Sequence, residues 1–197
     1  MKSFRLTLFA LFATGGFALA AQAQEVNYTL DPGHTEVIAT WTHLGFSQPS
    51  AMFDHIEGTL AFDQEHPETA RLSVKVPLNS VHTASDGLDE HLQKADFFEV
   101  DKYPVATFTS TKVERGSTPD SLRVTGDLEL HGTTQPLTLD VKVTKVGVHP
   151  MAKVQAAGFT ATATLKRSDW GIKNHVPMIS DDIRLVITTE AMAAKAE

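Results

Sequence analysis

The sequence predicts an all-β protein whose antiparallel strands form a barrel or a sandwich. Apolar and polar residues alternate along most of the chain, turn-forming residues separate the alternating stretches, and only one short window has helical periodicity. Strands at such spacing favour antiparallel architectures over alternating strand–helix units. The 197 residues contain no repeat and no internal linker, so we expect one folded domain.

Nine stretches are expected to form strands. The alternation is clearest between residues 121 and 131, where apolar side chains occupy one face and polar ones the other. Such a strand packs on one side and meets water on the other. The remaining stretches are 26–30, 37–44, 56–62, 72–78, 104–113, 137–143, 159–165 and 183–187.

One window, Asp86 to Ala95, is expected to be helical. Asp86 can cap its first turn, Asp89 suits the positive end of a helix, and three apolar residues fall on one face. A large apolar pair, Phe97 and Phe98, follows it. We expect this helix to lie across the barrel, either as a plug at one end or as a gate beside a ligand mouth.

The N-terminus has the pattern of a secretory signal peptide. A positively charged start precedes an apolar run from Leu6 to Ala20, and Ala21-Gln22-Ala23 forms an A-x-A cleavage site. Polar and Gly residues interrupt the run, which falls short of the roughly 20 apolar residues that a spanning helix needs. We therefore expect residues 1–23 to be removed and residues 24–197 to form the mature domain.

The charge balance disfavours several classes of partner. The chain carries 17 Lys and Arg residues against 24 Asp and Glu residues, and its net charge is −7. Cleavage would remove two basic residues and no acidic one, which lowers the charge to −9. A chain this acidic is a poor candidate for nucleic acid or for an anionic membrane surface. It contains no Cys, so its stability must come from packing without disulfides.

Motifs for catalysis or metal binding are missing from the sequence. Its nine His residues include no H-x-H, no H-E-x-x-H and no pair four residues apart. There is no Cys, no G-x-S-x-G turn and no Gly-rich phosphate loop. We therefore expect no enzyme activity, metal or cofactor, and an enzyme on an isoprenoid substrate or a His-based metal protein is kept as a minor alternative.

Four clusters of polar and turn-forming residues, taken together and in order, resemble the YceI family of bacterial periplasmic proteins. The first is the D-P-x-H-[ST] start at residues 31–35. The second is the H-L-x-x-x-D-F-F segment at 91–98, with Tyr103-Pro104 after it. The third is the strand turn from Gly126 to Thr134, and the fourth is the R-x-D-[FW]-G-I segment at 167–172. The resemblance covers about the whole chain from Glu25 to Glu190.

The resemblance implies an eight-stranded, lipocalin-like antiparallel barrel that binds a long isoprenoid or similar amphipathic lipid in the periplasm. Polyprenyl phosphates and quinone tails are such ligands, and transport, storage or stress protection are the corresponding roles. An eight-stranded barrel has room for one small ligand when side chains do not fill it. The alternative is a non-catalytic interaction protein with a solid core. Its candidate partners are a membrane redox protein and a second copy of the chain.

The chain departs from the family pattern at one turn. Ala51-Met52 precedes Phe53, where such proteins usually carry a Gly. The conformation of this turn, and the ligand mouth beside it, therefore cannot be carried over from the family.

The candidate site divides into an apolar lining and a headgroup-binding group. Cationic and hydrogen-bond-donating side chains suit a phosphate or carbonyl headgroup, and these are Arg167, Lys173 and His175, with His34 and His91 as further partners. A structural pair with Asp169 is the alternative role for Arg167. The expected lining consists of Val37, Ala39, Trp41, Phe53, Leu60, Phe62, Phe98, Phe108, Leu128, Leu130, Leu139, Phe159, Trp170 and Ile172.

Overall fold

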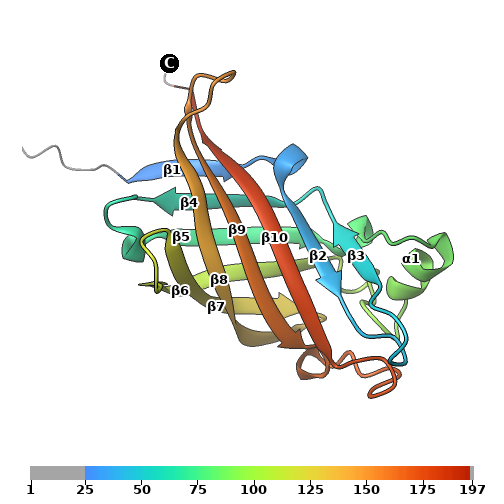
Figure 1. Ribbon diagram of the computed structural model, residues 1–197. Helices are drawn as coiled ribbons and strands as arrows, with labels where there is room; N and C mark the ends of the chain where they lie inside the picture. Colours follow the sequence, from blue (N-terminus) through green and yellow to red (C-terminus); the bar gives the residue numbers. More distant parts are fainter. Residues whose placement is uncertain (1–24, 196–197) are drawn as a thin grey trace, which may run out of the picture.

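Ten antiparallel strands form one sheet that closes on itself in the computed structural model, which describes residues 25–195 (Figure 1). Neighbouring strands follow the order β1-β4-β5-β6-β7-β8-β9-β10-β2-β3, and β1 also pairs with β10. The strands are β1 (Val26–Leu30), β2 (Glu36–Thr40), β3 (Ser50–Phe53), β4 (Glu57–Phe62), β5 (Arg71–Pro77), β6 (Val105–Arg115), β7 (Ser121–Leu130), β8 (Thr133–Val148), β9 (Gln155–Lys166) and β10 (Asp182–Ala193).

The ten strands occupy eight positions around the barrel. Strand β10 is long enough to pair with β1 near its end, where Leu30 lies opposite Ala191, and with β2 before that, where Val37 lies opposite Ile187. Strands β1 and β2 thus share one position beside β10. Strands β3 and β4 share the next position, because β3 pairs with β2 and β4 pairs with β1. The expected eight-stranded lipocalin-like barrel is confirmed, and two of its strands are broken.

The interior is apolar because the period-two alternation continues along the strands. In β9 every second residue from Ala157 to Leu165 is buried, and the residues between Phe159 and Lys166 that face outward are exposed. Strands β7 and β8 alternate in the same sense over most of their length. Register shifts after Ser110 in β6 and after Val143 in β8 mark bulges, which bend strands and increase their twist.

Strand β3 is an element that the alternation did not predict. It covers the turn that departs from the family pattern, with Ala51 and Phe53 buried. Met52 points the other way, and its backbone exchanges hydrogen bonds of 2.8 and 3.0 Å with His82. The segment is therefore a short strand with a conventional inward face.

Helix α1 (Asp86–Leu92) confirms the expected helix but ends earlier than residue 95. Its N-cap residue is Ser85 and not Asp86. The Asp89 carboxylate accepts hydrogen bonds from the backbone N–H and the hydroxyl of Thr83, at 2.7 and 2.6 Å, and so fixes the preceding turn. The four short 3-10 helices are η1 (Pro32–His34), η2 (Pro67–Thr69), η3 (Leu78–Ser80) and η4 (Arg167–Trp170).

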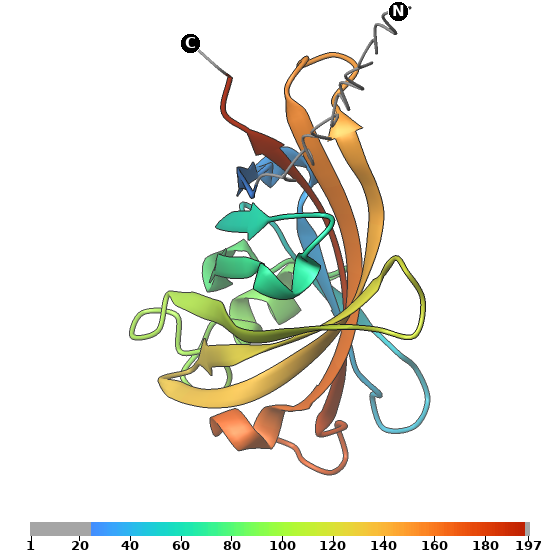
Figure 2. The ribbon, with the colours of Figure 1, turned by 90° about the vertical axis from the view of Figure 1, so that its left-hand side faces the viewer.

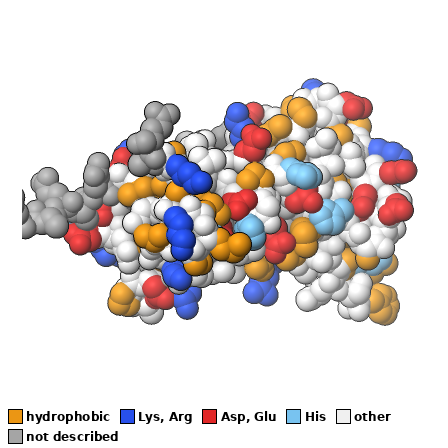
Figure 3. Space-filling model, turned by 90° about the horizontal axis from the view of Figure 1, so that it is seen from above, with side chains coloured by type: hydrophobic (Ala, Val, Ile, Leu, Met, Phe, Trp, Pro, Cys, Tyr) orange, Lys and Arg blue, Asp and Glu red, His pale blue; other side chains and the backbone are white. Residues whose placement is uncertain are grey.

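The two ends of the molecule differ. The β8–β9 hairpin projects at the top of Figures 1 and 2, whereas the β2–β3 loop and the loop between η4 and β10 lie together at the bottom. Viewed from above, the surface mixes hydrophobic, basic and acidic side chains (Figure 3). Within residues 25–195 no helix has the length and apolar character to cross a bilayer. The expected signal peptide, residues 1–23, lies outside the described residues.

Candidate ligand-binding site

The barrel encloses an apolar cavity of about 480 Å³. All ten strands contribute inward-facing residues to its wall, and α1 with the segment after it closes part of one end. The volume lies within the range of about 300–1,000 Å³ found for small-molecule sites. The chain therefore folds around space for a ligand and not around a solid core.

Thirteen of the fourteen residues expected to form the apolar lining border this cavity. They come from seven of the ten strands and from the segments after β2, α1 and η4. Two edge-to-face aromatic pairs brace the wall: Phe53 with Phe98, with ring centroids 5.8 Å apart, and Phe62 with Phe159, with ring centroids 5.4 Å apart. The thirteen are Val37, Ala39, Trp41, Phe53, Leu60, Phe62, Phe98, Phe108, Leu128, Leu130, Leu139, Phe159 and Ile172.

The fourteenth, Trp170, does not border the cavity. Its side chain is buried, and its indole N–H donates a 3.0 Å hydrogen bond to the backbone carbonyl of Leu128. The carbonyl of Trp170 is in turn 3.2 Å from Nδ1 of His131. Trp170 therefore attaches η4 to β7 as part of the packed core, and the structure places it off the cavity and not in the lining.

The segment after β5 covers one end of the cavity. Leu88 and Leu92 of α1 border the cavity together with Phe97 and Phe98. We name residues 86–98 the cover. The Leu92 side chain is buried, and the Phe98 ring makes an edge-to-face contact with Phe53 of β3. The helix thus lies where a plug or a gate would lie.

His91, on the cover, and His175, on the loop between η4 and β10, both border the cavity. His91, on the cover, lies with Nε2 3.2 Å from the Asp96 carboxylate and with its ring 5.0 Å from Phe97. Asn174 donates a 2.9 Å hydrogen bond to the same carboxylate. Asp96 therefore links the cover to the loop that carries His175.

Arg167 also borders the cavity, but its hydrogen bonds are directed into the protein. The side chain is 5% exposed. Its Nε donates to the carbonyl of Ser180 at 3.0 Å, Nη1 to that of Ile172 at 3.2 Å and Nη2 to that of Ile179 at 3.1 Å. Burial lowers the pKa of its guanidinium, and the Asp181 charge opposes that shift.

These contacts make Arg167 the anchor of the loop between η4 and β10. Asp181 strengthens the same anchor, since its carboxylate accepts hydrogen bonds from the backbone N–H and hydroxyl of Ser168 at 2.9 and 2.7 Å. Those hydrogen bonds lower the pKa of Asp181 although partial burial opposes the shift. The alternative of a pair with Asp169 is wrong, because backbone carbonyls and the charge of Asp181 are the partners of Arg167.

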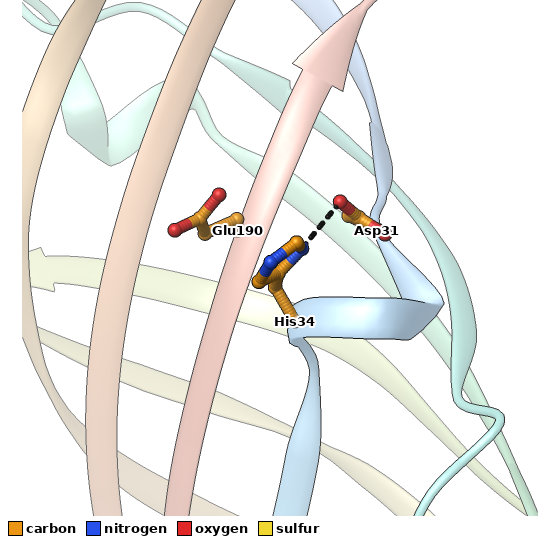
Figure 4. A group of neighbouring side chains, drawn as sticks. All are labelled: Asp31, His34 and Glu190. Atoms are coloured by element: carbon orange, nitrogen blue, oxygen red, sulfur yellow. Dashed lines mark hydrogen bonds and ion pairs between the residues drawn. The ribbon is translucent and has the colours of Figure 1, made fainter. Parts of the chain in front are cut away.

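Lys173 and His34 do not border the cavity. Lys173 is exposed on the loop after η4. His34 ends η1, and its Nδ1 lies 2.8 Å from the Asp31 carboxylate (Figure 4). Of the five expected headgroup residues, the structure therefore brings together only Arg167, His175 and His91.

The turn around His34 is a polar cluster on the barrel surface. Asp31 accepts from the Gly33 N–H at 2.9 Å, which explains the η1 turn, and Glu190 of β10 lies beside the pair (Figure 4). The hydrogen bond to Asp31 raises the pKa of His34, and the same bond lowers the pKa of Asp31. Asp31, His34 and Glu190 each offer one atom that could coordinate a metal ion, and these three atoms lie within 4.8 Å of one another. The spacing of the His residues did not predict this group.

Three polar residues on the cavity were not predicted. The hydroxyls of Thr35 and Thr189 lie 2.7 Å apart, which satisfies both groups inside an apolar wall. His43 borders the mouth. Period two could have found His43, because Val37, Ala39, Trp41 and His43 continue one inward row past the end of β2.

Comparison with known proteins gives consistent results. A family described as "YceI-like domain" matches residues 28–191. Protein YceI of Shigella flexneri is 36% identical over 192 residues, which cover 96% of each chain. The crystal structure of a Campylobacter jejuni YceI protein superposes with a TM-score of 0.68 at 30% identity, over 78% of this chain and 90% of that one.

A more distant structure shows the same fold. A polyisoprenoid-binding domain from Saccharophagus degradans has a TM-score of 0.63 at 17% identity, over 86% of this chain and 99% of that one. The family match covers most of the described barrel, and the Shigella relative is similar over nearly the full length. The chain is therefore a member of the YceI-like domain family.

Proposed function

We propose that this protein binds one long-chain isoprenoid, or a lipid of similar shape, inside the barrel and carries it through the periplasm without chemical change. The apolar cavity is the observation that carries the proposal. Apart from Thr35, Thr189, Arg167 and three His residues, its border is hydrophobic. Such a surface matches a hydrocarbon chain and offers no group for a polar substrate to bind along the wall.

The energetics support binding by burial alone. Placing about 500 Å² of ligand hydrocarbon in the cavity at ~25 cal/mol/Å² gives roughly 12 kcal/mol before the costs of association. Those costs amount to several kcal/mol, which leaves about micromolar or tighter affinity. Each further methylene adds only ~0.8 kcal/mol, so the wall selects chain length weakly.

Headgroup discrimination then falls to the polar residues at the covered end. His91 and His175 can each donate to a carbonyl or phosphate oxygen, and neither is fully buried. Arg167 contributes positive potential, since its own donors are occupied by carbonyls. A polyprenyl phosphate or a quinone satisfies both requirements, an apolar tail and an acceptor head.

Family membership supports the same proposal. The related domain from Saccharophagus degradans is described as binding a polyisoprenoid. The charged start, apolar run and A-x-A motif of residues 1–23 support export to the periplasm. Both the cavity and the family favour binding over catalysis.

The first experiment is detergent-free purification from the periplasm, followed by solvent extraction and mass spectrometry. A stoichiometric isoprenoid in the extract is the expected result, and its mass identifies the tail and head. An empty protein that also fails to take up added quinone or polyprenyl phosphate would overturn the proposal.

Adjacent residues of β9 provide a matched pair of variants. Ala161 is buried against the cavity, whereas Thr162 is exposed on the outer face. Ala161→Phe should fill the cavity and weaken isoprenoid uptake at least about tenfold, since a phenyl ring displaces several methylenes. Thr162→Phe should leave uptake unchanged. Ala39→Phe on β2 repeats the test at a second point of the wall, should Ala161→Phe not fold.

A further inference from the structure

Two loops at the covered end of the barrel expose large hydrophobic side chains. Leu44 and Phe46 lie on the β2–β3 loop and are 49% and 92% exposed, and Met178 on the loop before β10 is 61% exposed. We name these three residues the apolar tip. Single exposed hydrophobic residues are ordinary on protein surfaces, so their arrangement decides whether the tip has a function.

Hydrogen bonds between the two loops hold the tip together. The backbone N–H of Leu44 donates to the carbonyl of Met178 at 3.0 Å, and that of Ser180 donates to the carbonyl of Thr42 at 3.0 Å. The N–H of Thr42 also donates to the Ser180 hydroxyl at 2.9 Å. The side chains are therefore presented from one connected platform and not from two independent loops.

The platform is continuous with the cavity. Trp41, His43 and Pro49 of the first loop and His175 and Ile179 of the second border the cavity directly. The exposed tip therefore lies on the same two loops as residues that border the cavity.

The charge of the platform differs from that of the rest of the protein. Residues 41–49 and 172–180 contain none of the 24 acidic residues, and their one Lys or Arg is Lys173. The neighbouring helix α1, in contrast, carries Asp86, Asp89 and Glu90. The net charge of −7 argues against broad adsorption to an anionic surface, but the platform itself carries no negative side chain to be repelled.

We propose that the apolar tip inserts into the surface of a phospholipid bilayer. The mouth of the cavity then opens toward the acyl region, from which an isoprenoid enters. This inference rests on the proposed isoprenoid-binding function. A bilayer fits better than a protein partner because the tip is small and leads into a space that accepts hydrocarbon.

The β8–β9 hairpin is a strict control. Val148 and Met151 are 58% and 86% exposed there, residues 144–154 also contain two Lys and no acidic residue, and none of these residues borders the cavity. The hairpin lies at the opposite end of the molecule (Figures 1 and 2). Like the tip, it exposes large hydrophobic side chains and carries no acidic residue, but it lies away from the cavity.

The test is flotation with phosphatidylcholine vesicles, using residues 24–197, which include every described residue. Phe46→Ser with Met178→Ser should lower vesicle binding about tenfold or more, because each residue loses the burial of a large side chain. Val148→Ser with Met151→Ser should bind as the parent does. Equal losses in both, a loss only in the hairpin variant, or no binding by the parent would each overturn the proposal.

A second readout separates this inference from the proposed function. Both double variants should take up farnesol from solution as the parent does, while the tip variant should take up an isoprenoid from vesicles about tenfold more slowly. Vesicle binding without any isoprenoid uptake would refute the carrier function and leave membrane docking intact. Isoprenoid uptake at parental rates from vesicles by the tip variant would refute docking and leave the carrier function intact.

Discussion

The wall of the barrel and its mouth are built by different interactions. The wall is held by sheet pairing and by inward apolar rows, so each residue has the same kind of role as its neighbours two positions away. The mouth is held by single side-chain hydrogen bonds, above all those of Arg167 and Ser180 to the backbone and that of Asp96 to the Asn174 side chain. We therefore expect the wall to tolerate many hydrophobic substitutions. The mouth, formed by the β2–β3 loop, the cover and the loop between η4 and β10, depends on a few individual residues for its stability.

Replacing Arg167 breaks the mouth and should have the largest effect on stability. Arg167→Ala removes three hydrogen bonds from a charged group and leaves buried carbonyls without donors, which should lower the free energy of unfolding by about 3 kcal/mol. Chemical denaturation measures this change. Arg167→Lys, which keeps the charge but loses the fork of donors, should fall between the parent and the Ala variant.

Isoprenoid affinity of the folded Arg167→Ala protein is a separate measurement. Unchanged affinity would exclude a headgroup role for this residue. A loss of less than about 0.5 kcal/mol in stability would contradict the anchoring role and, with it, the contrast between mouth and wall.

Crowding the wall should have the next largest effect. A Cβ at Gly126 of β7 would lie 2.4 Å from Phe108 Cζ and 2.5 Å from the Thr109 carbonyl oxygen. Gly126→Ala should therefore cost about 2 kcal/mol, because the backbone oxygen cannot move aside. Gly147→Ala in β8, where a Cβ meets nothing within 4 Å, is the control and should be neutral or slightly stabilising in thermal unfolding.

The two Trp residues distinguish a side chain that borders the cavity from one that supports the fold away from it. Trp170→Phe removes one buried hydrogen bond and should lower the free energy of unfolding by about 1 kcal/mol without changing isoprenoid affinity. Trp41→Phe should change affinity instead, because Trp41 borders the cavity. Fluorescence of the two single-Trp proteins checks this directly: ligand should alter the emission of Trp41 and not that of Trp170.

The smallest effect is expected at the surface turn of η1. The pKa of His34 is raised above its ordinary 6.5 and that of Asp31 is lowered below its ordinary 3.8. Their ionic attraction thus contributes fully between these two values, fades as pH rises through the folded pKa of His34, and fades as pH falls through that of Asp31.

The difference in melting temperature between the parent and His34→Ala should accordingly be largest near pH 5 and shrink above pH 7. Isoprenoid affinity should not change, since His34 lies off the cavity. A constant difference at all pH values would show that the turn is held by packing and not by this pair.

Most of the barrel wall could be predicted from the sequence, because side chains alternate between the two faces of a strand and the interior of the barrel is apolar. Alternation between residues 121 and 131 and between 159 and 165 predicted β7 and most of β9, and with them Leu128, Leu130 and Phe159 of the lining. Strand β3 was missed because four residues are too few to show a period.

The mouth could not be predicted in the same way. Arg167 is held by carbonyls of residues 172, 179 and 180, and any residue supplies a carbonyl, so no side-chain pattern reveals them. Trp170 was misplaced for a related reason, since the partner of its indole N–H is also a backbone carbonyl, that of Leu128. Whether the interior is open depends on the barrel's diameter, which pairing between distant strands determines.

The wall also has a consequence for how a bound chain would move. Apart from the Thr35–Thr189 pair and the polar residues at the covered end, the side chains that border the cavity are apolar. No hydrogen bond from these apolar side chains would therefore fix the position of a bound chain along the barrel axis. A hydrocarbon tail could slide over one or two carbons and exchange equivalent contacts, which preserves part of its conformational entropy. Such a tail would stay conformationally mobile inside the barrel, and chains of several lengths would bind in overlapping positions. In a crystal of the complex, only the headgroup would occupy a single well-defined position.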